Sequence, residues 1–492
     1  MSVSSLYLRY AKNVMKKIIY TLMLSVLLAA CSEEADFSSD TSLRLEFSCD
    51  TIQFDTLFTT IGSPTAMMKV YNRNNSSLRL SSVRLVGGKS GFRINVDGQF
   101  ADIIRDVEIR KKDSMYLFVE ATLDGNGADA PLFVSDSVQF TLESGVQQYV
   151  ALLAYGRDVD FLRGVTYNVD AKIAAGHYIV YDSLVVAPEA TLNIEPGVTL
   201  YFHKDAQMIV RGTVKAEGSR ELPIVFRGDR TDNMFSYLPY DRIPGQWGGV
   251  TIDSTSCGNI FSHCDIHSAK YGIKVVEGDT VAQRLTVDAS RIENFDGNAL
   301  ETTMARVDVR NSLLANARGN CVKVVGGRVR FVHCTIANFY VWKQRDVALT
   351  LHNSIDGRPA PLREALFANC IVEGSREDEI MGYLSTLGDS VPDCRNYLFV
   401  SSLLNTVNDG DSCFVNNVFD SKEETPFGAQ QFRLVDHSVF MYDFHLSDSA
   451  LARGVAASEY SAALKYDLDG NERPDSLADV GCFQYVPLPE EK

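Results

Sequence analysis

Charged and titratable side chains occupy matching positions in two neighbouring stretches of the sequence. Asp265 and His267 are followed 26 residues later by Arg291 and Glu293. Because alternate side chains of a strand point to opposite faces, these four residues would share one outer face. There Asp265 or Glu293 would act as a general acid or base, and Arg291 would hold the carboxylate of an acidic sugar. The alternative is a solvated strand face with charge pairs worth at most about 1 kcal/mol each.

A second candidate is an aromatic segment over residues 235–244. Phe235, Tyr237 and Tyr240 lie there in a loop that also carries prolines. Aromatic rings beside polar groups suit the apolar faces of sugars, so the segment predicts a glycan-binding platform. The alternative is a loop that folds onto the flank of the domain and covers its core. Trp247, which opens a predicted strand, is expected to be structural.

Metal sites are disfavoured by residue spacing. His263 and His267 would lie about 13 Å apart along one strand, whereas zinc lies about 2 Å from its ligand nitrogens. Residues 467–471, with Asp467, Asp469 and Asn471, resemble a calcium loop superficially but lack its regular acidic ligands and terminal glutamate. We therefore expect no metal or cofactor, with calcium at this loop as the alternative left open. Neither a nucleophile-elbow motif nor a phosphate loop occurs in the chain.

The elements that must position these residues are short repeats. A small residue followed two positions later by an aliphatic one begins units at Cys264, Ser290, Ser312, Cys334 and Cys370. The steps are 26, 22, 22 and 36 residues. A spacing near 22 is too short for helix pairs and fits one coil of a parallel β-helix, and the longer steps would be coils that carry loops. The small and aliphatic residues would face the interior, and Cys264, Ile266, Ile292, Leu314, Cys334 and Ile336 would form one stack. Asn294, Asn316 and Asn338 would align as a ladder of amides on coils about 4.8 Å apart.

Several segments carry a family resemblance. Residues 191–202, 208–214, 223–228 and 245–250 resemble the first coils of right-handed parallel β-helix proteins of the pectate-lyase-like superfamily. The resemblance runs over residues 165–485, and residues 467–474 and 479–483 look like the closing segment of many β-helix surface proteins. It implies an architecture without a reaction, because a fold does not imply a function.

Residues 44–156 predict a separate all-β domain. Six runs are rich in β-branched or aromatic residues: Leu43–Phe47, Ala66–Tyr71, Leu78–Leu85, Ser114–Ala121, Ser137–Leu142 and Gln148–Tyr155. Turn-forming clusters separate them, so the segment predicts an antiparallel sandwich. The asparagine turn at Asn72 and the closing residues 150–156 resemble immunoglobulin-like domains of the ASPM/SPD-2/Hydin type. Such domains are mostly spacers or binding modules.

The start of the chain predicts export and anchoring. The apolar run 18–30 follows Lys16 and Lys17, is too short to span roughly 30 Å of hydrocarbon, and ends in small residues before Cys31. It resembles the lipobox of bacterial lipoproteins, which implies translation from Met15, removal of residues 1–30, acylation of Cys31 and a tether over 31–43. Residues 32–34 resemble the acidic tag of Bacteroidota surface lipoproteins, with a plain acidic tether as the alternative. We expect a lipid-anchored, surface-exposed protein of the outer membrane.

Charge and cysteine content narrow the function classes. A formal net charge of −16 repels phosphate backbones, so we expect no nucleic-acid partner. Nine cysteines follow Cys31 without a C-x-x-C pair, which favours core cysteines over redox or zinc sites. Three functions remain: a glycan-binding or scaffold module, a polysaccharide lyase or hydrolase acting on acidic glycans, and an adhesin that binds surface proteins. The first is favoured, because no catalytic set is complete.

Overall fold

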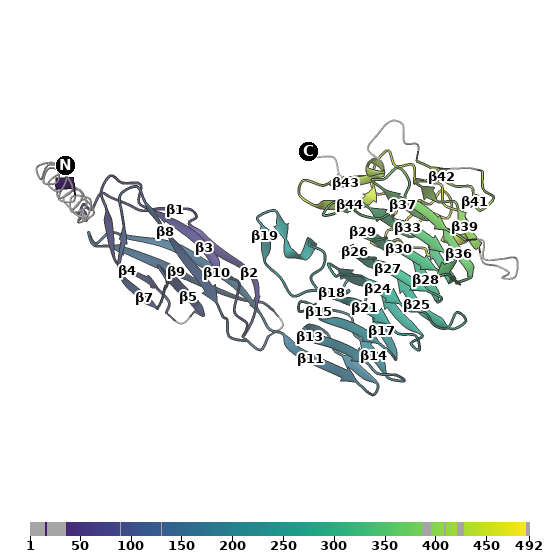
Figure 1. Ribbon diagram of the computed structural model, residues 1–492, viewed down its shortest axis with the longest axis horizontal. Coiled ribbons are helices and arrows are strands. Elements are labelled where there is room, and N and C mark those ends of the chain that lie inside the picture. The colour runs from purple at the N-terminus through teal and green to yellow at the C-terminus, as the bar shows by residue number, and fades with distance from the viewer. Residues whose placement is uncertain are drawn as a thin grey trace, which may run out of the picture. The chain divides into compact units, whose positions relative to one another are not determined.

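The computed structural model describes residues 15–16, 36–88, 90–128, 130–385, 395–407, 410–420 and 428–488. The described chain is almost entirely β-structure and forms two compact units that divide near Arg157 (Figure 1). Cys31 and the rest of the predicted export signal apart from Met15 and Lys16 lie outside the described residues. No helix in the described part of the chain is long and apolar enough to cross a bilayer.

The first unit is a sandwich of two five-stranded sheets, with strand orders β1-β3-β8-β5-β6 and β2-β10-β9-β4-β7. The strands are β1 (Glu46–Phe47), β2 (Thr51–Phe58), β3 (Ala66–Tyr71), β4 (Leu78–Leu85), β5 (Phe92–Val96), β6 (Gln99–Phe100), β7 (Ile103–Ile109), β8 (Ser114–Ala121), β9 (Leu132–Leu142) and β10 (Gln147–Arg157). Alternate apolar residues of both sheets meet in one core. The pairs are antiparallel except β2–β10, which is parallel.

The second unit is a parallel β-helix. It opens with β11 (Asp160–Tyr167) and β13 (Gly176–Val186), and β13 pairs with both β15 (Val198–Phe202) and β16 (Gln207–Val210). Each later coil as far as β38 (Ile380–Tyr383) contributes one strand to each of three faces, which we call A, B and C, and the described coils after it contribute strands to faces B and C.

Face A contains β16 (Gln207–Val210), β21 (Gly249–Ile252), β24 (Ile273–Val275), β27 (Leu300–Thr303), β30 (Val322–Val325), β33 (Leu349–His352) and β38 (Ile380–Tyr383). Face B contains β12 (Ala171–Ile173), β14 (Thr191–Ile194), β17 (Thr213–Glu217), β22 (Asn259–Ser262), β25 (Gln283–Asp288), β28 (Arg306–Arg310), β31 (Gly327–Val332), β36 (Leu362–Ala368), β39 (Arg395–Val400) and β41 (Phe414–Val415). Face C contains β15 (Val198–Phe202), β18 (Ile224–Gly228), β23 (Cys264–His267), β26 (Arg291–Phe295), β29 (Leu313–Ala317), β32 (Thr335–Asn338), β37 (Ile371–Gly374), β40 (Leu403–Leu404) and β42 (Val418–Phe419).

Aliphatic side chains stack along the interior of the coils. The stack that the repeats predicted is confirmed, since Cys264, Ile266, Ile292, Leu314, Cys334 and Ile336 are all buried in one cluster. Trp247 is structural as expected, because its ring is fully buried and stacks on Phe202 with centroids 4.2 Å apart. The asparagines differ from the predicted ladder: Asn338 bonds the backbone N–H and C=O of Ala317, not a neighbouring amide.

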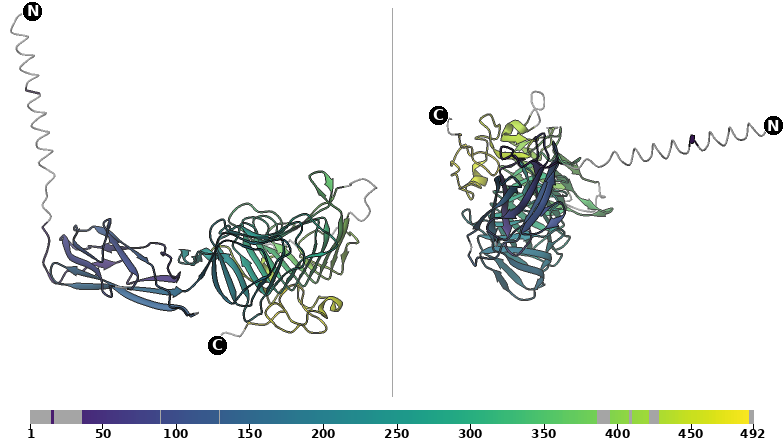
Figure 2. Two further views of the ribbon diagram at one scale, coloured as in Figure 1. Left: turned by 90° about the horizontal axis from the view of Figure 1, so that it is seen from below. Right: turned by 90° about the vertical axis from the view of Figure 1, so that its left-hand side faces the viewer.

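The C-terminal residues lie outside the coils. The last described strand of the β-helix is β42. Residues 428–488 then pack along the outer side of face C, and they are seen in yellow beside the stacked coils (Figure 2). This segment contains the short helices η2 (Ala429–Gln431) and α2 (Ser458–Ser461) and the hairpin of β43 (Phe432–Asp436) and β44 (Met441–Leu446). Outward residues of face C are apolar where the segment covers them, among them Leu313, Ala337 and Ile371. Residues that resemble the end of a β-helix therefore cover its flank.

Candidate functional site

The predicted polar cluster forms on the outer side of face C. Strands β23 and β26 pair in parallel so that Asp265 lies opposite Arg291, and His267 lies opposite Glu293. This is the register that the 26-residue step predicted, and the extra residues are accommodated between the strands. All four side chains lie on the face opposite to buried Ile266 and Ile292 in their own strands.

His267 is held between two aspartates. Its Nδ1 lies 2.8 Å from Asp265 Oδ1, and its Nε2 lies 2.8 Å from Asp241 Oδ1. Arg227 also contacts Asp241, at 2.8 Å. Burial alone would lower the pKa of His267, but the charges of Asp265 and Asp241 outweigh it and raise that pKa to about 10. The imidazole is therefore protonated at neutral pH and donates to both carboxylates.

Arg291 is engaged by the C-terminal segment. Its Nη2 lies 2.7 Å from Asp469 Oδ1, and its guanidinium lies over the ring of Phe483. From the sequence we expected Arg291 to be open to a sugar carboxylate, whereas in the structure it contacts the carboxylate of Asp469. The difference arises because residues 428–488 fold back onto face C, which no repeat pattern signals.

Asp469 also joins a second histidine to the cluster. His445 on β44 contacts Asp469 through Nε2 at 2.7 Å and Asp443 through Nδ1. Burial lowers the pKa of His445, but hydrogen bonds to the two aspartates outweigh it and raise that pKa to about 9. Two protonated histidines, each between two aspartates, thus flank Arg291 and Glu293. Sequence reasoning missed His445, although the alternation in Asp443-Phe444-His445 indicates a strand with both polar side chains on one face.

Glu293 is the member of the cluster whose charge is least stabilised. Burial raises its carboxyl pKa, the charge of Asp265 raises it further, and Arg291 opposes the shift. Its carboxyl group makes no hydrogen bond with other described residues, whereas both histidines are fully engaged. Glu293 is therefore the group placed to donate a proton or hydrogen bond to a ligand, and neither histidine is free to act as a base.

The aromatic segment joins the same face. It forms the hairpin of β19 (Asn233–Phe235) and β20 (Leu238–Pro239), followed by the 3-10 helix η1 (Tyr240–Arg242). Phe235 and Tyr237 are 54% and 48% exposed, and their rings stack with centroids 5.7 Å apart and an interplanar angle of 14°. Tyr240 is separate from this pair, because Arg230 covers its ring at 3.7 Å.

The base of the hairpin is fixed to face C. Asp241 follows Tyr240 directly and bonds His267, while the Ser268 hydroxyl donates to the backbone carbonyl of Asp241. Leu238 is buried at the end of the hairpin. The polar cluster and the aromatic pair, which the sequence presented as separate candidates, are therefore linked through η1.

The calcium-like loop is filled by protein donors. The carboxylate of Asp467 accepts hydrogen bonds from the backbone N–H groups of Asn471 and Gln484 and from the Asn471 amide. Asp469 is engaged by His445 and Arg291. These contacts give no reason to place a cation at the loop, and the described residues contain no group of three or more acidic, histidine or cysteine side chains arranged for a metal.

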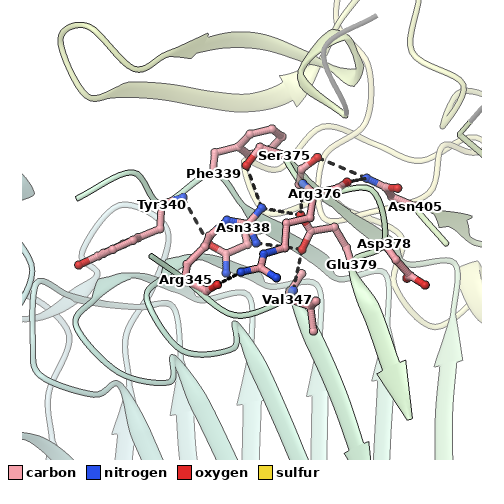
Figure 3. A network of polar contacts seen from close by, with 12 residues as sticks. Asn338, Phe339, Tyr340, Arg345, Val347, Ser375, Arg376, Asp378, Glu379 and Asn405 are labelled. Atoms are coloured by element: carbon pink, nitrogen blue, oxygen red, sulfur yellow. Dashed lines mark hydrogen bonds and ion pairs between the residues drawn. The ribbon is translucent and has the colours of Figure 1, made fainter. Parts of the chain in front are cut away.

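A polar network around Arg345 and Glu379, separate from the candidate site, is structural. Arg345 and Glu379 form a buried, two-pronged ion pair whose nitrogen–oxygen distances are 2.5 and 3.1 Å (Figure 3). The backbone N–H groups of Ala348 and Arg376 also donate to Glu379, so the carboxylate is fully bonded. Together with Asn338, the network holds the loops that precede β33 and β38.

Comparisons with known proteins give matches in fold only. No family model matches this chain, and a search of curated proteins finds no match. A family 28 exopolygalacturonase of Yersinia enterocolitica has 10% identity, a TM-score of 0.30, and covers 73% of this chain and 85% of its own. A family 87 α-1,3-glucanase of Streptomyces thermodiastaticus has 12% identity, a TM-score of 0.30, and coverages of 72% and 75%. A Porphyromonas gingivalis protein of unknown function has 15% identity and a TM-score of 0.18, covers 26% of this chain, and is matched over half of its own length.

Proposed function

We propose that this protein is a lipid-anchored module of the outer membrane that binds glycans through the β19–β20 hairpin. The observation that carries the proposal is the exposed, stacked pair of Phe235 and Tyr237. Two large rings held in water cost free energy unless a ligand covers them, and flat aromatic surfaces complement the apolar faces of sugar rings.

Polar groups beside the hairpin suit sugar hydroxyls. Asp241 and Asp265 have side chains that are 35% and 33% exposed. His267 contacts only the Oδ1 atom of each, so the Oδ2 atom of each carboxylate is not bonded to His267. Carboxylates accept strong hydrogen bonds from hydroxyl groups. Because these aspartates are already fixed by His267, little side-chain freedom is lost when a ligand binds.

A glycan array tests the proposal with the soluble chain from residue 32 onward. Phe235→Ala and Tyr237→Ala should each weaken a positive glycan about three- to tenfold, from about 0.5–1.5 kcal/mol per ring contact. Tyr149→Ala, which removes a ring that is 52% exposed on the first unit, is the control and should bind normally. An array without any hit, or equal binding by all three variants and the wild type, would refute the proposal.

Membrane attachment is tested separately. Cys31→Ala should release the protein from membranes or leave it unprocessed, because acylation needs the cysteine and stable anchoring needs about two acyl chains. Normal processing with unchanged membrane fractionation would contradict lipidation at Cys31. The two-sheet sandwich of the first unit supports a spacer role, in which it would hold the β-helix away from the lipid.

Hydrolysis of an acidic glycan is the second candidate function, and the raised pKa of Glu293 favours it. A carboxyl group whose pKa is raised by burial is suited to act as a general acid, and the carboxylate of Asp265 lies on the neighbouring strand β23. Release of reducing ends from the array ligand should then occur with the wild type and cease in Glu293→Gln, with binding retained. Equal release by this variant would exclude Glu293 from the chemistry.

A further inference from the structure

The outer side of face B carries a groove lined by arginines, far in sequence from the hairpin. Arg306 and Arg310 lie on β28, and Arg328 and Arg330 lie on β31, all four opposite to buried valine and phenylalanine residues of the same strands. Two adjoining hollows of about 300 and 510 Å³ run along these strands and share Asp308 and Arg330 in their walls. We call them together the arginine groove.

Like charges face each other directly in this groove. Arg306 and Arg328 are register partners on neighbouring parallel strands, which places their backbones about 4.8 Å apart. Like charges directly opposite each other on neighbouring strands destabilise a sheet, whereas opposite charges at such positions stabilise it. Face B has opposite charges in register at a neighbouring position, since Asp288 and Arg310 are register partners that form an ion pair at 2.8 Å.

The charge in the smaller hollow is not neutralised within the protein. Three arginines face two carboxylates there, Asp308 and Glu364, although the whole chain has a net charge of −16. Glu364 is shared by Arg328 at 3.6 Å and Arg330 at 3.8 Å. Arg306 donates to the carbonyl of Val281, and among the described residues no carboxylate oxygen lies within 4 Å of its guanidinium nitrogens. An anion between Arg306 and Arg328 would remove the repulsion.

An apolar wall borders the larger hollow. Tyr460, Ala463 and Leu464 form it, opposite Arg310 and Arg330, and Glu459 lines the same hollow. Tyr460 comes from α2 and packs on Leu366, Ala368 and Val400 of face B.

The wall is held rigidly by two turn residues between faces B and C. His333 Nε2 bonds the hydroxyl of Ser461 at 2.8 Å, and Asn369 bonds both the N–H and the C=O of Ala457. His333 and Asn369 have φ values of 50° and 52°, so each side chain projects at the corner. The wall is thus fixed before any ligand binds, which lowers the entropy cost of binding.

We infer that the arginine groove binds a chain of acidic sugars. Arg306 and Arg328 would donate together to one sugar carboxylate in the smaller hollow, since guanidinium groups match carboxylates in geometry. Tyr460 and Leu464 would contact the apolar face of the adjoining sugar in the larger one. The inference does not depend on the β19–β20 hairpin, because the two features share no residue.

Calorimetric titration of the soluble chain tests this site. The probes are a galacturonic-acid oligosaccharide, a maltooligosaccharide of equal length and inorganic phosphate. We expect binding of the acidic oligosaccharide that weakens with added salt, no binding of the neutral one, and loss of about tenfold or more in the variant Arg306→Gln/Arg328→Gln. Arg211→Gln is the matched control, because Arg211 is an exposed, ion-paired arginine elsewhere on the helix, and it should bind normally.

Three outcomes overturn the inference. They are failure of the wild type to bind the acidic oligosaccharide, equal binding by the double variant and the control, and binding of phosphate as tight as that of the sugar. Misfolding is excluded by thermal unfolding, because removing the Arg306–Arg328 repulsion should leave the midpoint unchanged or raise it. If Phe235→Ala weakens the acidic probe and the arginine variant does not, the hairpin holds that ligand, which refutes this site and supports the proposed function.

Discussion

Replacing Asp241 by asparagine should destabilise the β-helix in a pH-dependent way. A pKa of His267 raised from 6.5 to about 10 corresponds to roughly 5 kcal/mol of stabilisation by Asp265 and Asp241 together. Asp241 supplies one of these two carboxylates and its side chain is 35% exposed, so screening reduces its share. We expect Asp241→Asn to lower the free energy of unfolding by about 1–2 kcal/mol at pH 6.

The sign of the pH dependence follows from the same shift. Because the pKa of His267 is higher in the folded than in the unfolded state, the stabilisation is complete below pH 6.5 and is lost as the pH rises toward 10. His445, with a pKa raised to about 9, adds a loss in the same direction. The wild type should therefore become less stable from pH 7 to 10, and Asp241→Asn should show a smaller decline.

Tryptophan fluorescence during urea unfolding measures this effect selectively. Trp247 and Trp342 are the two tryptophans of the chain, and both lie in the second unit. The ring N–H of Trp247 donates to the backbone carbonyl of His267 at 2.9 Å, so the probe sits beside the perturbed strand. Asp205→Asn, which removes an exposed partner of Lys270, is the control and should unfold like the wild type. Parallel pH profiles for wild type and Asp241→Asn, or a wild type that gains stability from pH 7 to 10, would refute the reasoning.

Three further substitutions probe the aliphatic interior of the β-helix and two of its buried carboxylates. Ile336→Asp places an unpaired charge in the aliphatic stack and should cost several kcal/mol, about 3–5, in urea unfolding; unchanged stability would contradict the packing. Arg345→Met leaves the buried carboxylate of Glu379 without its ion-pair partner and should lower the free energy of unfolding by about 3–5 kcal/mol. Adding Glu379→Leu should restore a large part of this loss, and no recovery would show that the broken pair is not its cause. Glu373→Gln should raise the unfolding midpoint at pH 8 and not at pH 4. Neither carboxylate oxygen of Glu373 has a hydrogen-bond partner among the described residues, and burial and the charge of Asp420 raise the pKa of this carboxyl group. Ionisation of Glu373 therefore opposes folding at high pH, and a midpoint unchanged at pH 8 would contradict this.

Local alternation was enough to predict several strands and the register of one pair in the β-helix. The predicted runs Ala66–Tyr71, Leu78–Leu85 and Ser114–Ala121 coincide with β3, β4 and β8. The pairing of β23 with β26 followed from the spacing of the repeats, because a coil length and a period of two fix which side chains share a face. Strands β2 and β7 were not identified, because polar residues make up four of the eight positions of β2 and three of the seven of β7 and interrupt their apolar runs.

The partners of the site could not be predicted from the same patterns. Asp241 reaches His267 through a hairpin of irregular sequence, and Asp469 reaches Arg291 across 178 residues. Contacts of this kind depend on how loops and the C-terminal segment fold onto a face, which periodicity does not encode. The aromatic pair was identified from composition alone, but the separation of Tyr240 from it depends on Arg230, a contact that only the fold supplies.

The most direct test of glycan binding is a crystal structure of the soluble chain with an oligosaccharide selected on the array. We expect a sugar ring lying flat on Phe235 or Tyr237, with hydroxyl groups within hydrogen-bond distance of Asp241 or Asp265. A bound oligosaccharide that leaves both rings in solvent and contacts another surface would contradict it.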